Sequence, residues 1–550
     1  MTAERKHQLR FAGLLAAAAL LLLPGLGSVD LWAPDEPRYA QVAEELRSME
    51  HGLPGLALLH LGGEAYTQKP PLYYWLAAGF GAASGGRVSE LVARLPSALA
   101  GIAAVLVTAK LGQMLFGRLA VGLWSGALLL CAYRFAHTAR RAQLDVLLLL
   151  FELLALLAFW RLEQGRGSRR SNLVLLHGAT ALALLTKGPV GLLPIAVMAA
   201  FLAWERRLGE LRQLLPIWGL LLSLGPVLLW IGAAVALSPP GFFDEAVMTN
   251  LFGRFFSGTA HARPFYYYAI QLPIDFLPWT ALWPLATLVA LRSSDRPEET
   301  QPRRFLLAWV GVMLVFFSLS AGKRGLYLLP AFPALALLCG SALDRALETP
   351  DSALAPWVGR ALGVPAVALV VLGGALAAQG GLVVERFPGF GLSGELGLAL
   401  SGIGLAAIGG WLVLTRRRAP PAARVAVVIA SCAAIELAVF ALAYPGYDAE
   451  KSPRPIAEAA TRIAAPGEPV GIFDHRALRG GILYYGRRQV VDLATPESVR
   501  RFFEAGGRAV ILNAYKLPWL EEVGPLEVRA RVRSKLREVL VVTPDFEVSR

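Results

Sequence analysis

Long apolar runs separated by short polar segments fill the first 445 residues. A run of about 20 apolar residues is long enough to cross a bilayer as a helix. Such runs occur near residues 11–29, 90–111, 119–136, 144–160, 172–187, 189–204, 214–237, 273–291, 305–321, 326–343, 357–382, 393–414 and 424–444. The pattern predicts an all-α polytopic membrane domain over residues 1–445, with about thirteen transmembrane helices. The first run has no small-residue cleavage site and is expected to be retained.

The short loops between alternate runs are rich in Lys and Arg. They read "RLEQGRGSRRSN", "ERRLGELR", "RSSDRPEETQPRR" and "TRRRAPPAAR". Because cytoplasmic loops carry an excess of these residues, the pattern predicts a cytoplasmic N-terminus. An odd number of helices then places the large loops near 30–89 and 238–272, and the segment 446–550, outside.

The pattern changes after the last apolar run. Residues 446–550 alternate short β-rich runs such as "RAVIL" with helix-like segments such as "PESVRRFFEAG". This alternation predicts an external soluble α/β domain. The segment shows no metal-ligand spacing, phosphate loop or nucleophile elbow, so we expect a lid or a partner-binding module.

The composition supports a membrane protein. Of the 550 residues, 55% are hydrophobic and 17% charged, and the mean hydropathy is +0.52. Cys131, Cys339 and Cys432 fall inside apolar runs, which argues against a disulfide framework. The net charge of +13 does not by itself indicate a nucleic-acid partner, because the location of the charges matters more than their sum.

Many cations are expected at the external ends of the helices. They are Arg38, Lys69, Arg134, Arg140, Arg141, Lys187, Arg254, Arg263, Lys323 and Arg324. Ionisable groups near the hydrocarbon are costly and usually functional, so we expect an anionic ligand such as a lipid phosphate. The alternative is that these side chains only reach out to lipid headgroups. For Lys187 in "TKGP", a further alternative is a simple turn at Gly188 and Pro189.

Acidic residues accompany these cations. Asp35 and Glu36 follow the first run, and Asp145 opens the run "VLLLLFELLALLAFW". The alternatives are a solvated turn at "PDEPRYA" and an N-cap at Asp145. From these residues alone both alternatives stay open, although cations that only reach out to lipid headgroups would not explain the accompanying acids.

Several motifs resemble one known family. "DEPRYA", "YTQKPPLYYW", "RRAQLDVLLLL", "TKGPVGLLP", "NLFGRFF", "HARPFYYY" and "GKRGLYLLPAFPALALL" occur in the expected order. The chain resembles the GT-C membrane glycosyltransferases that use polyprenyl-phosphate sugars, particularly the aminoarabinose transferases and protein mannosyltransferases. The C-terminal domain resembles that of the aminoarabinose group. The resemblance implies a periplasmic site in a bacterial inner membrane, a polyprenyl-phosphate sugar donor, and lipid A or a protein as acceptor.

The resemblance also implies roles for individual residues. Lys69 and Tyr327 match the donor-phosphate contacts. Arg254, Lys323 and Arg324 are added to them because they are positively charged and are expected on the external side of the membrane. Asp35 matches the essential loop aspartate, and Glu36 and Asp145 are further catalytic candidates. The expected substrate-binding residues are Arg38, Tyr39, Tyr66, Arg141 and His261. Asp35 would act as a base for a hydroxyl acceptor, whereas a phosphate acceptor is already ionised and needs only orientation.

The sequence departs from the family at Gln68. In aminoarabinose transferases a glutamate commonly precedes the loop lysine, and it is thought to hold a metal together with a histidine that matches His261. A neutral amide is a poor ligand for a divalent cation, so we expect no metal and no cofactor. Other classes are a lipid or sugar transporter, disfavoured because no internal repeat is seen, and a noncatalytic scaffold.

Overall fold

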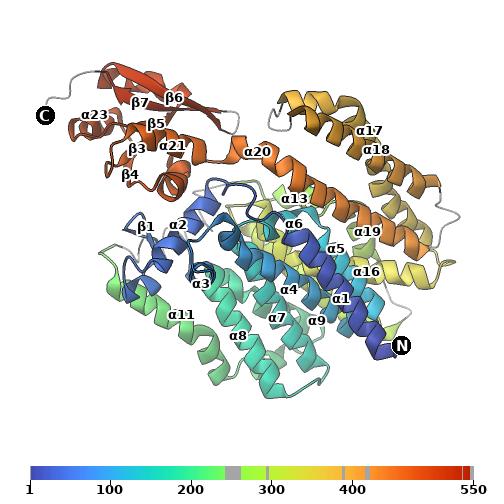
Figure 1. The fold of residues 1–550 in the computed structure, drawn as a ribbon. Helices are drawn as coiled ribbons and strands as arrows, with labels where there is room; N and C mark the ends of the chain where they lie inside the picture. Colours follow the sequence, from blue (N-terminus) through green and yellow to red (C-terminus); the bar gives the residue numbers. More distant parts are fainter. Residues whose placement is uncertain are drawn as a thin grey trace.

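A computed structural model describes residues 2–241, 244, 262–292, 296–386, 391–414, 421–534 and 537–545. Helices dominate this chain up to residue 451, and Figure 1 shows them as a bundle. The bundle helices are α1 (Ala3–Leu22), α4 (Glu90–Phe116), α5 (Leu119–Leu130), α6 (Tyr133–Ala139), α7 (Leu144–Glu163), α8 (Arg169–Lys187), α9 (Leu193–Trp204), α10 (Leu211–Leu214), α11 (Ile217–Leu237), α13 (Tyr267–Asp275), α14 (Leu282–Leu291), α15 (Thr300–Leu319), α16 (Phe332–Glu348), α17 (Ala355–Arg386), α18 (Gly391–Leu414), α19 (Pro421–Ala438) and α20 (Tyr444–Lys451).

The structure confirms a polytopic helical membrane protein. Seven helical stretches of the described residues are long and apolar enough to cross a membrane, or eight if the bent pair α5 and α6 forms one span. Each of the thirteen predicted runs contains helix, but only some of these helices meet both the length and the polarity requirement. The coarse prediction therefore holds, whereas the number thirteen stays a prediction.

The turn proposed at Gly188 separates α8 from α9. Gly188 has a positive φ of 70°, which a glycine adopts without strain. Gly191 then lies against the backbone of Ala183, since a Cβ built on Gly191 would come within 2.6 Å of the Ala183 carbonyl carbon. The chain therefore folds back over the end of α8, which places Lys187 at this turn.

The bundle has a buried centre and an apolar rim. The stretch that contains α16 is 83% buried in its most apolar window, whereas that of α11 is 11% buried although it is more hydrophobic. An apolar helix that stays exposed is expected to face lipid. These helices thus form a membrane-embedded scaffold.

The loop between α1 and α4 contains local structure of its own. Its elements are α2 (Asp35–Arg47), β1 (His60–Leu61), β2 (Glu64–Ala65) and α3 (Leu72–Ala83). The two strands pair antiparallel as a short hairpin. Figure 1 shows α2 and β1 between the bundle and the C-terminal sheet.

The C-terminal segment has the mixed α/β character that the sequence predicts. Its elements are α21 (Arg454–Ile463), β3 (Val470–Phe473), α22 (Arg479–Gly481), β4 (Val490–Leu493), α23 (Pro496–Glu504), β5 (Val510–Asn513), β6 (Leu526–Ser534) and β7 (Arg537–Pro544). The strand order is β4-β3-β5-β7-β6, with β3 parallel to β4 and β5, and β7 antiparallel to its neighbours. Helix α23, capped by Thr495 and Ser498, connects β4 to β5, as a parallel crossover requires.

Candidate active site

Asp35 begins α2 and lies between two arginines. Its side chain is 8% exposed, and its Oδ1 lies 2.5 Å from the Arg38 guanidinium, one helical turn further along α2. The guanidinium of Arg324, which precedes the short helix η7 (Gly325–Ala331), lies 3.3 Å from Oδ2. The fold thus holds the Asp35 carboxylate between Arg38 of the same helix and Arg324, which lies 289 positions from Asp35 in the sequence.

The same cations set the charge of Asp35. Burial alone would raise the pKa of this carboxyl, but Arg38, Arg324 and Lys69 together lower it below its ordinary value of 3.8. Opposite charges within a few ångströms favour the ionised form of an acid. Asp35 is therefore an anion at neutral pH and has no proton to donate.

Glu36 faces a different set of partners. Its carboxylate is fully buried and accepts hydrogen bonds from Arg94 (3.0 Å), Arg141 (3.0 Å) and the backbone N–H groups of Trp32 (2.9 Å) and Ala142 (2.8 Å). Burial would raise its pKa, but Arg141 and Arg94 lower it to about 2. Glu36 thus ties the start of α2 to α4 and to the connection before α7.

Asp145 pairs with Lys187. The sequence left two interpretations of Lys187 open, a contact with lipid phosphate or a simple turn at Gly188 and Pro189. The Lys187 Nζ donates to Asp145 Oδ1 at 2.5 Å and lies 4.5 Å from the ring centroid of Tyr327. Tyr327 is carried by η7, as is the backbone next to Arg324. The η7 segment therefore brings the Asp145–Lys187 pair and the Asp35–Arg324 pair to the same side of the bundle.

Aromatic side chains pack beside Arg38. Tyr39, Tyr66 and Tyr74 are buried, their rings pack edge to face, and the Tyr74 hydroxyl donates to that of Tyr66 at 3.2 Å. Arg38 lies 5.4 Å from the Tyr39 ring centroid. Arg141, besides its bond to Glu36, stacks 4.8 Å from the Trp32 ring. Four of the five predicted substrate-binding residues thus lie on or beside α2.

Lys323 points elsewhere. Its ammonium is buried and donates to the carbonyls of Ser320 and Arg263, the latter at 3.1 Å. Its geometry joins two backbone segments and does not place it with Asp35. Arg254 and His261 lie outside the described residues.

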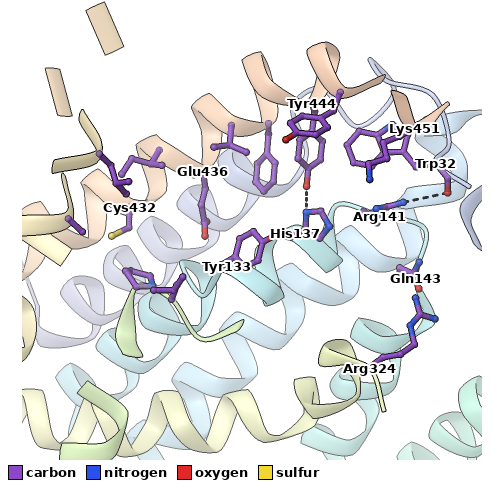
Figure 2. A pocket seen from close by; sticks show the side chains of 18 of the residues that line it. Trp32, Tyr133, His137, Arg141, Gln143, Arg324, Cys432, Glu436, Tyr444 and Lys451 are labelled. Atoms are coloured by element: carbon purple, nitrogen blue, oxygen red, sulfur yellow. Dashed lines mark hydrogen bonds between the residues drawn. The ribbon is translucent and has the colours of Figure 1, made fainter. Parts of the chain in front are cut away.

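A cavity of about 740 Å³ opens beside Asp35 (Figure 2). Its polar end is formed by Asp35, Arg141, Gln143 and Arg324. The side formed by α17 and α19 is mostly apolar but also carries Glu436 of α19, and Lys451 of α20 lines the cavity as well. The apolar lining residues are Leu277, Pro278, Pro365, Ala368, Leu369, Leu372, Ile435, Val439 and Phe440. A cavity with one charged end and one apolar side suits a molecule with a charged head and a hydrocarbon tail.

Sequence reasoning missed part of this wall. Tyr133 and His137 line the cavity from α6, and the Tyr444 hydroxyl hydrogen-bonds His137 Nδ1. Their signal was the four-residue spacing of Tyr133 and His137, which places both side chains on one face of α6.

One group with metal-ligand chemistry occurs among the described residues. Glu45, Glu50 and His51 each offer a ligand atom, and these atoms lie within 4.8 Å of one another. Glu45 is ten residues beyond Asp35 on α2, about 15 Å along the helix. This group is therefore separate from the Asp35 cluster.

Comparison with known proteins agrees with the geometry. Residues 8–243 match the family model described as dolichyl-phosphate-mannose-protein mannosyltransferase. A relative from Pseudomonas fluorescens, undecaprenyl phosphate-alpha-4-amino-4-deoxy-L-arabinose arabinosyl transferase 2, is 33% identical over 60% of this chain and 56% of its own length. The undecaprenyl phosphate-alpha-4-amino-4-deoxy-L-arabinose arabinosyl transferase from Pseudomonas paraeruginosa is 32% identical over 62% of this chain and 60% of its own length. The aligned region thus spans less than two thirds of these relatives.

The similarity in fold extends further. The crystal structure of ArnT from Cupriavidus metallidurans bound to undecaprenyl phosphate is 21% identical to the chain, with a TM-score of 0.77 over 96% of this chain and 97% of that one. These findings confirm the predicted resemblance: residues 8–243 match the dolichyl-phosphate-mannose-protein mannosyltransferase family, and the chain as a whole has the fold of that ArnT structure.

Proposed function

We propose that the chain transfers 4-amino-4-deoxy-L-arabinose from undecaprenyl phosphate to lipid A at the periplasmic face of a bacterial inner membrane. The observation that carries the proposal is the cavity whose charged end is Asp35 and Arg324 and whose side along α17 and α19 is mostly apolar. The charged end suits a phosphate-linked sugar, and the apolar wall suits a lipid. The names of the curated relatives supply the sugar.

The reaction needs positive charge more than acid catalysis. The bond between the sugar's anomeric carbon and the donor phosphate oxygen breaks, and undecaprenyl phosphate leaves with the electron pair. A phosphate oxygen of lipid A forms the new bond to the same carbon. The departing phosphate needs no proton, and preorganised cations and donors stabilise its charge. Lys69, Arg324 and Tyr327 are proposed for this role, with Lys187 added because it lies over Tyr327.

Asp35 is proposed to orient the sugar. It is ionised and clamped between Arg38 and Arg324, so it suits an acceptor of hydrogen bonds from sugar hydroxyls. With an ionised lipid A phosphate as nucleophile, no base is required. Asp145 would hold Lys187 in place, and Glu36 would hold the start of α2.

The remaining predicted residues keep more limited roles. Arg38, Tyr39, Tyr66 and Arg141 are proposed to shape the sugar-binding space. For Lys323 the proposed role is to order the loop before η7. Contacts of Arg254 with donor phosphate and of His261 with substrate stay proposals from the sequence.

The same proposal includes a topology. Thirteen spans with a cytoplasmic N-terminus would place the loop 30–89, the loop 238–272 and the domain 446–550 in the periplasm, above the membrane domain 1–445. In support, α2 and the C-terminal sheet lie on one side of the bundle in Figure 1. Membrane lipids would surround exposed apolar helices such as α11.

A second candidate is protein O-glycosylation. The match of residues 8–243 to the mannosyltransferase family favours it. A serine or threonine hydroxyl must lose its proton, so Asp35 would then act as the base, an effect typically worth about 10²–10⁴-fold.

The experiment uses the purified chain with undecaprenyl phosphate-aminoarabinose as donor. Lipid A and a Ser/Thr-rich peptide are offered separately, and products are measured by mass spectrometry. We expect transfer to lipid A only, with turnover lost in Asp35→Asn while donor still binds. Asp351→Asn, an exposed aspartate between α16 and α17, is the matched control. Transfer to the peptide alone would select the second candidate, and full turnover in Asp35→Asn would contradict the role of Asp35.

A further inference from the structure

The far end of α2 carries a compact group of metal-binding side chains. Glu45 lies in the last turn of α2, and Glu50 and His51 lie in the turns that follow it. Their ligand atoms all lie within 4.8 Å of one another. The Glu45 side chain is 3% exposed, so a carboxylate is held there away from bulk water.

Two histidines add imidazole nitrogens to this place. The rings of His51 and His60 stack with their centroids 3.6 Å apart. His51 Nε2 and His60 Nδ1 are both buried and have no hydrogen-bond partner. Because an unpaired buried polar atom is costly, both nitrogens indicate a missing partner.

The space between these groups has the size of a single ion. Glu45, His51 and His60 line a small, partly open cavity of about 10 Å³ together with Leu46 and Met49, and the exposed Glu50 lies outside this lining. A volume of this size holds about one water-sized sphere. His51 Nε2 lies 3.8 Å from Glu45 Oε2, too far for a direct hydrogen bond but within the roughly 4 Å that two ligands of one zinc ion can span.

The donor set favours one class of cation. Neutral imidazole nitrogen together with carboxylate oxygen is typical of zinc and similar transition metals, whereas Ca²⁺ and Mg²⁺ prefer oxygen ligands alone.

We propose that Glu45, Glu50 and His51, with His60 beside them, bind one divalent transition-metal ion of the zinc type. This position differs from the one that the family resemblance implies, where Gln68 replaces the expected glutamate. The proposal does not depend on the proposed function.

The metal would fix the loop that leads to the candidate active site. Glu45 also accepts hydrogen bonds from the N–H groups of Gly62 (2.7 Å) and Gly63 (3.3 Å), at the tip of the β1–β2 hairpin. The chain continues from this hairpin directly to Tyr66 and Lys69. A metal at the end of α2 would therefore connect the helix that begins with Asp35 to the segment that carries Lys69.

The test uses the full chain purified without a polyhistidine tag and stripped with a chelator. Co²⁺ alone is titrated and followed by visible absorption, Zn²⁺ is titrated by calorimetry, and thermal unfolding is recorded with and without Zn²⁺. We expect one equivalent to bind and the Tm to rise. Because loss of even an outer-shell partner weakens metal binding about 10–100-fold, His51→Gln and Glu50→Gln should each weaken it at least about tenfold.

Two control variants make the result specific. His475→Gln, in the C-terminal domain, should bind metal as the wild type does. If His51→Gln does not fold, Glu50→Gln decides, since Glu50 is exposed. Absence of stoichiometric binding, or wild-type binding in Glu50→Gln, would overturn the proposal. So would loss of the metal in His261→Gln, because that result would place the ion at the family's position.

Discussion

At the residue scale, two neighbouring acids have opposite surroundings. Asp35 meets two partly exposed arginines beside a cavity, whereas Glu36 is enclosed by Arg94 and Arg141. Successive helix residues point about 100° apart, so one acid faces the cavity and the next faces the bundle. Asp35 is available to a ligand, and Glu36 is occupied in holding α2.

Glu36→Gln is expected to destabilise the protein. The substitution leaves the buried Arg94 and the partly exposed Arg141 without a carboxylate, and breaking a buried ion pair costs about 3–5 kcal/mol. The pKa of Glu36 is lowered from 4.5 to about 2, so its stabilisation is complete above about pH 4.5 and is lost as the pH falls toward 2. Thermal unfolding at several pH values should show a lower Tm for the variant at pH 7 and a smaller difference near pH 3.

The control for this prediction is Glu497→Gln. Glu497 forms an exposed pair with Arg501 on α23, and such pairs contribute little. An unchanged Tm in Glu36→Gln would show that the buried network does not hold α2.

Lys187→Met is expected to weaken donor binding. A charged hydrogen bond is worth about 1.5–3 kcal/mol, so the KM for the donor should rise about tenfold or more. Lys187→Arg should restore part of the affinity, which separates lost charge from lost packing. The control is Lys110→Met, an exposed lysine on α4 that hydrogen-bonds Gln113. An unchanged donor KM in Lys187→Met would remove Lys187 from the phosphate site.

The sequence could predict these residues only in part. Asp35 and Lys69 lie in one loop, so their proximity follows from local motifs. Lys187 and Asp145 are 42 residues apart, and a lysine at the end of a helix is equally consistent with a turn. Lys323 and Arg324 are adjacent with the same charge, and only the fold turns one toward backbone carbonyls and the other toward Asp35.

At the element scale, the C-terminal domain packs against α2. A Cβ built on Gly480 of α22 would lie 2.7 Å from the Arg38 Cα. Nearby, Arg454 bridges Asp30 and Glu90, and the Tyr485 hydroxyl accepts from the Leu31 N–H. The domain therefore positions the helix that carries Asp35 and Arg38.

Gly480→Ala is expected to reduce turnover several-fold. The added methyl cannot fit against the Arg38 backbone, so α2 or α22 must shift, and Asp35 shifts with α2. Transfer rates of the purified variant should fall while the bundle stays folded by circular dichroism. Gly79→Ala, in α3 with no atom within 4 Å of the new Cβ, is the matched control. Equal rates for both variants would mean that the domain does not position α2.

The long apolar runs of the sequence predicted the helices, but they did not predict how neighbouring helices connect. The apolar runs mark the helices because burial and lipid exposure both demand apolar residues. Two details were not evident from the runs. One is the bend of 68° between α5 and α6, and the other is the continuation of α19 through Val439–Ala443 into α20. Both depend on packing between helices distant in sequence.

At the scale of the whole molecule, the account requires the C-terminal domain and α2 to lie outside the cytoplasm. The described sheet domain contacts the first large loop through the partly exposed Arg454–Asp30 ion pair and the close approach of Gly480 to Arg38. A single orientation of the bundle therefore fixes the side of both.

Cysteine labelling tests this orientation. The native Cys131, Cys339 and Cys432 are buried, so they should give little background. Arg508→Cys, 54% exposed at its side chain, should react with a membrane-impermeant maleimide in cells with a permeabilised outer membrane. Arg206→Cys, between α9 and α10, should react only after the inner membrane is opened. The reverse pattern would invert the topology and contradict a periplasmic site.

The central claim is that this chain adds aminoarabinose to lipid A. Its most direct test is mass spectrometry of lipid A from cells that make the donor, with the chain present, absent or replaced by Asp35→Asn. We expect an added aminoarabinose mass that requires the chain and disappears in the variant. Lipid A of unchanged mass in cells that express the chain and contain the donor would contradict it.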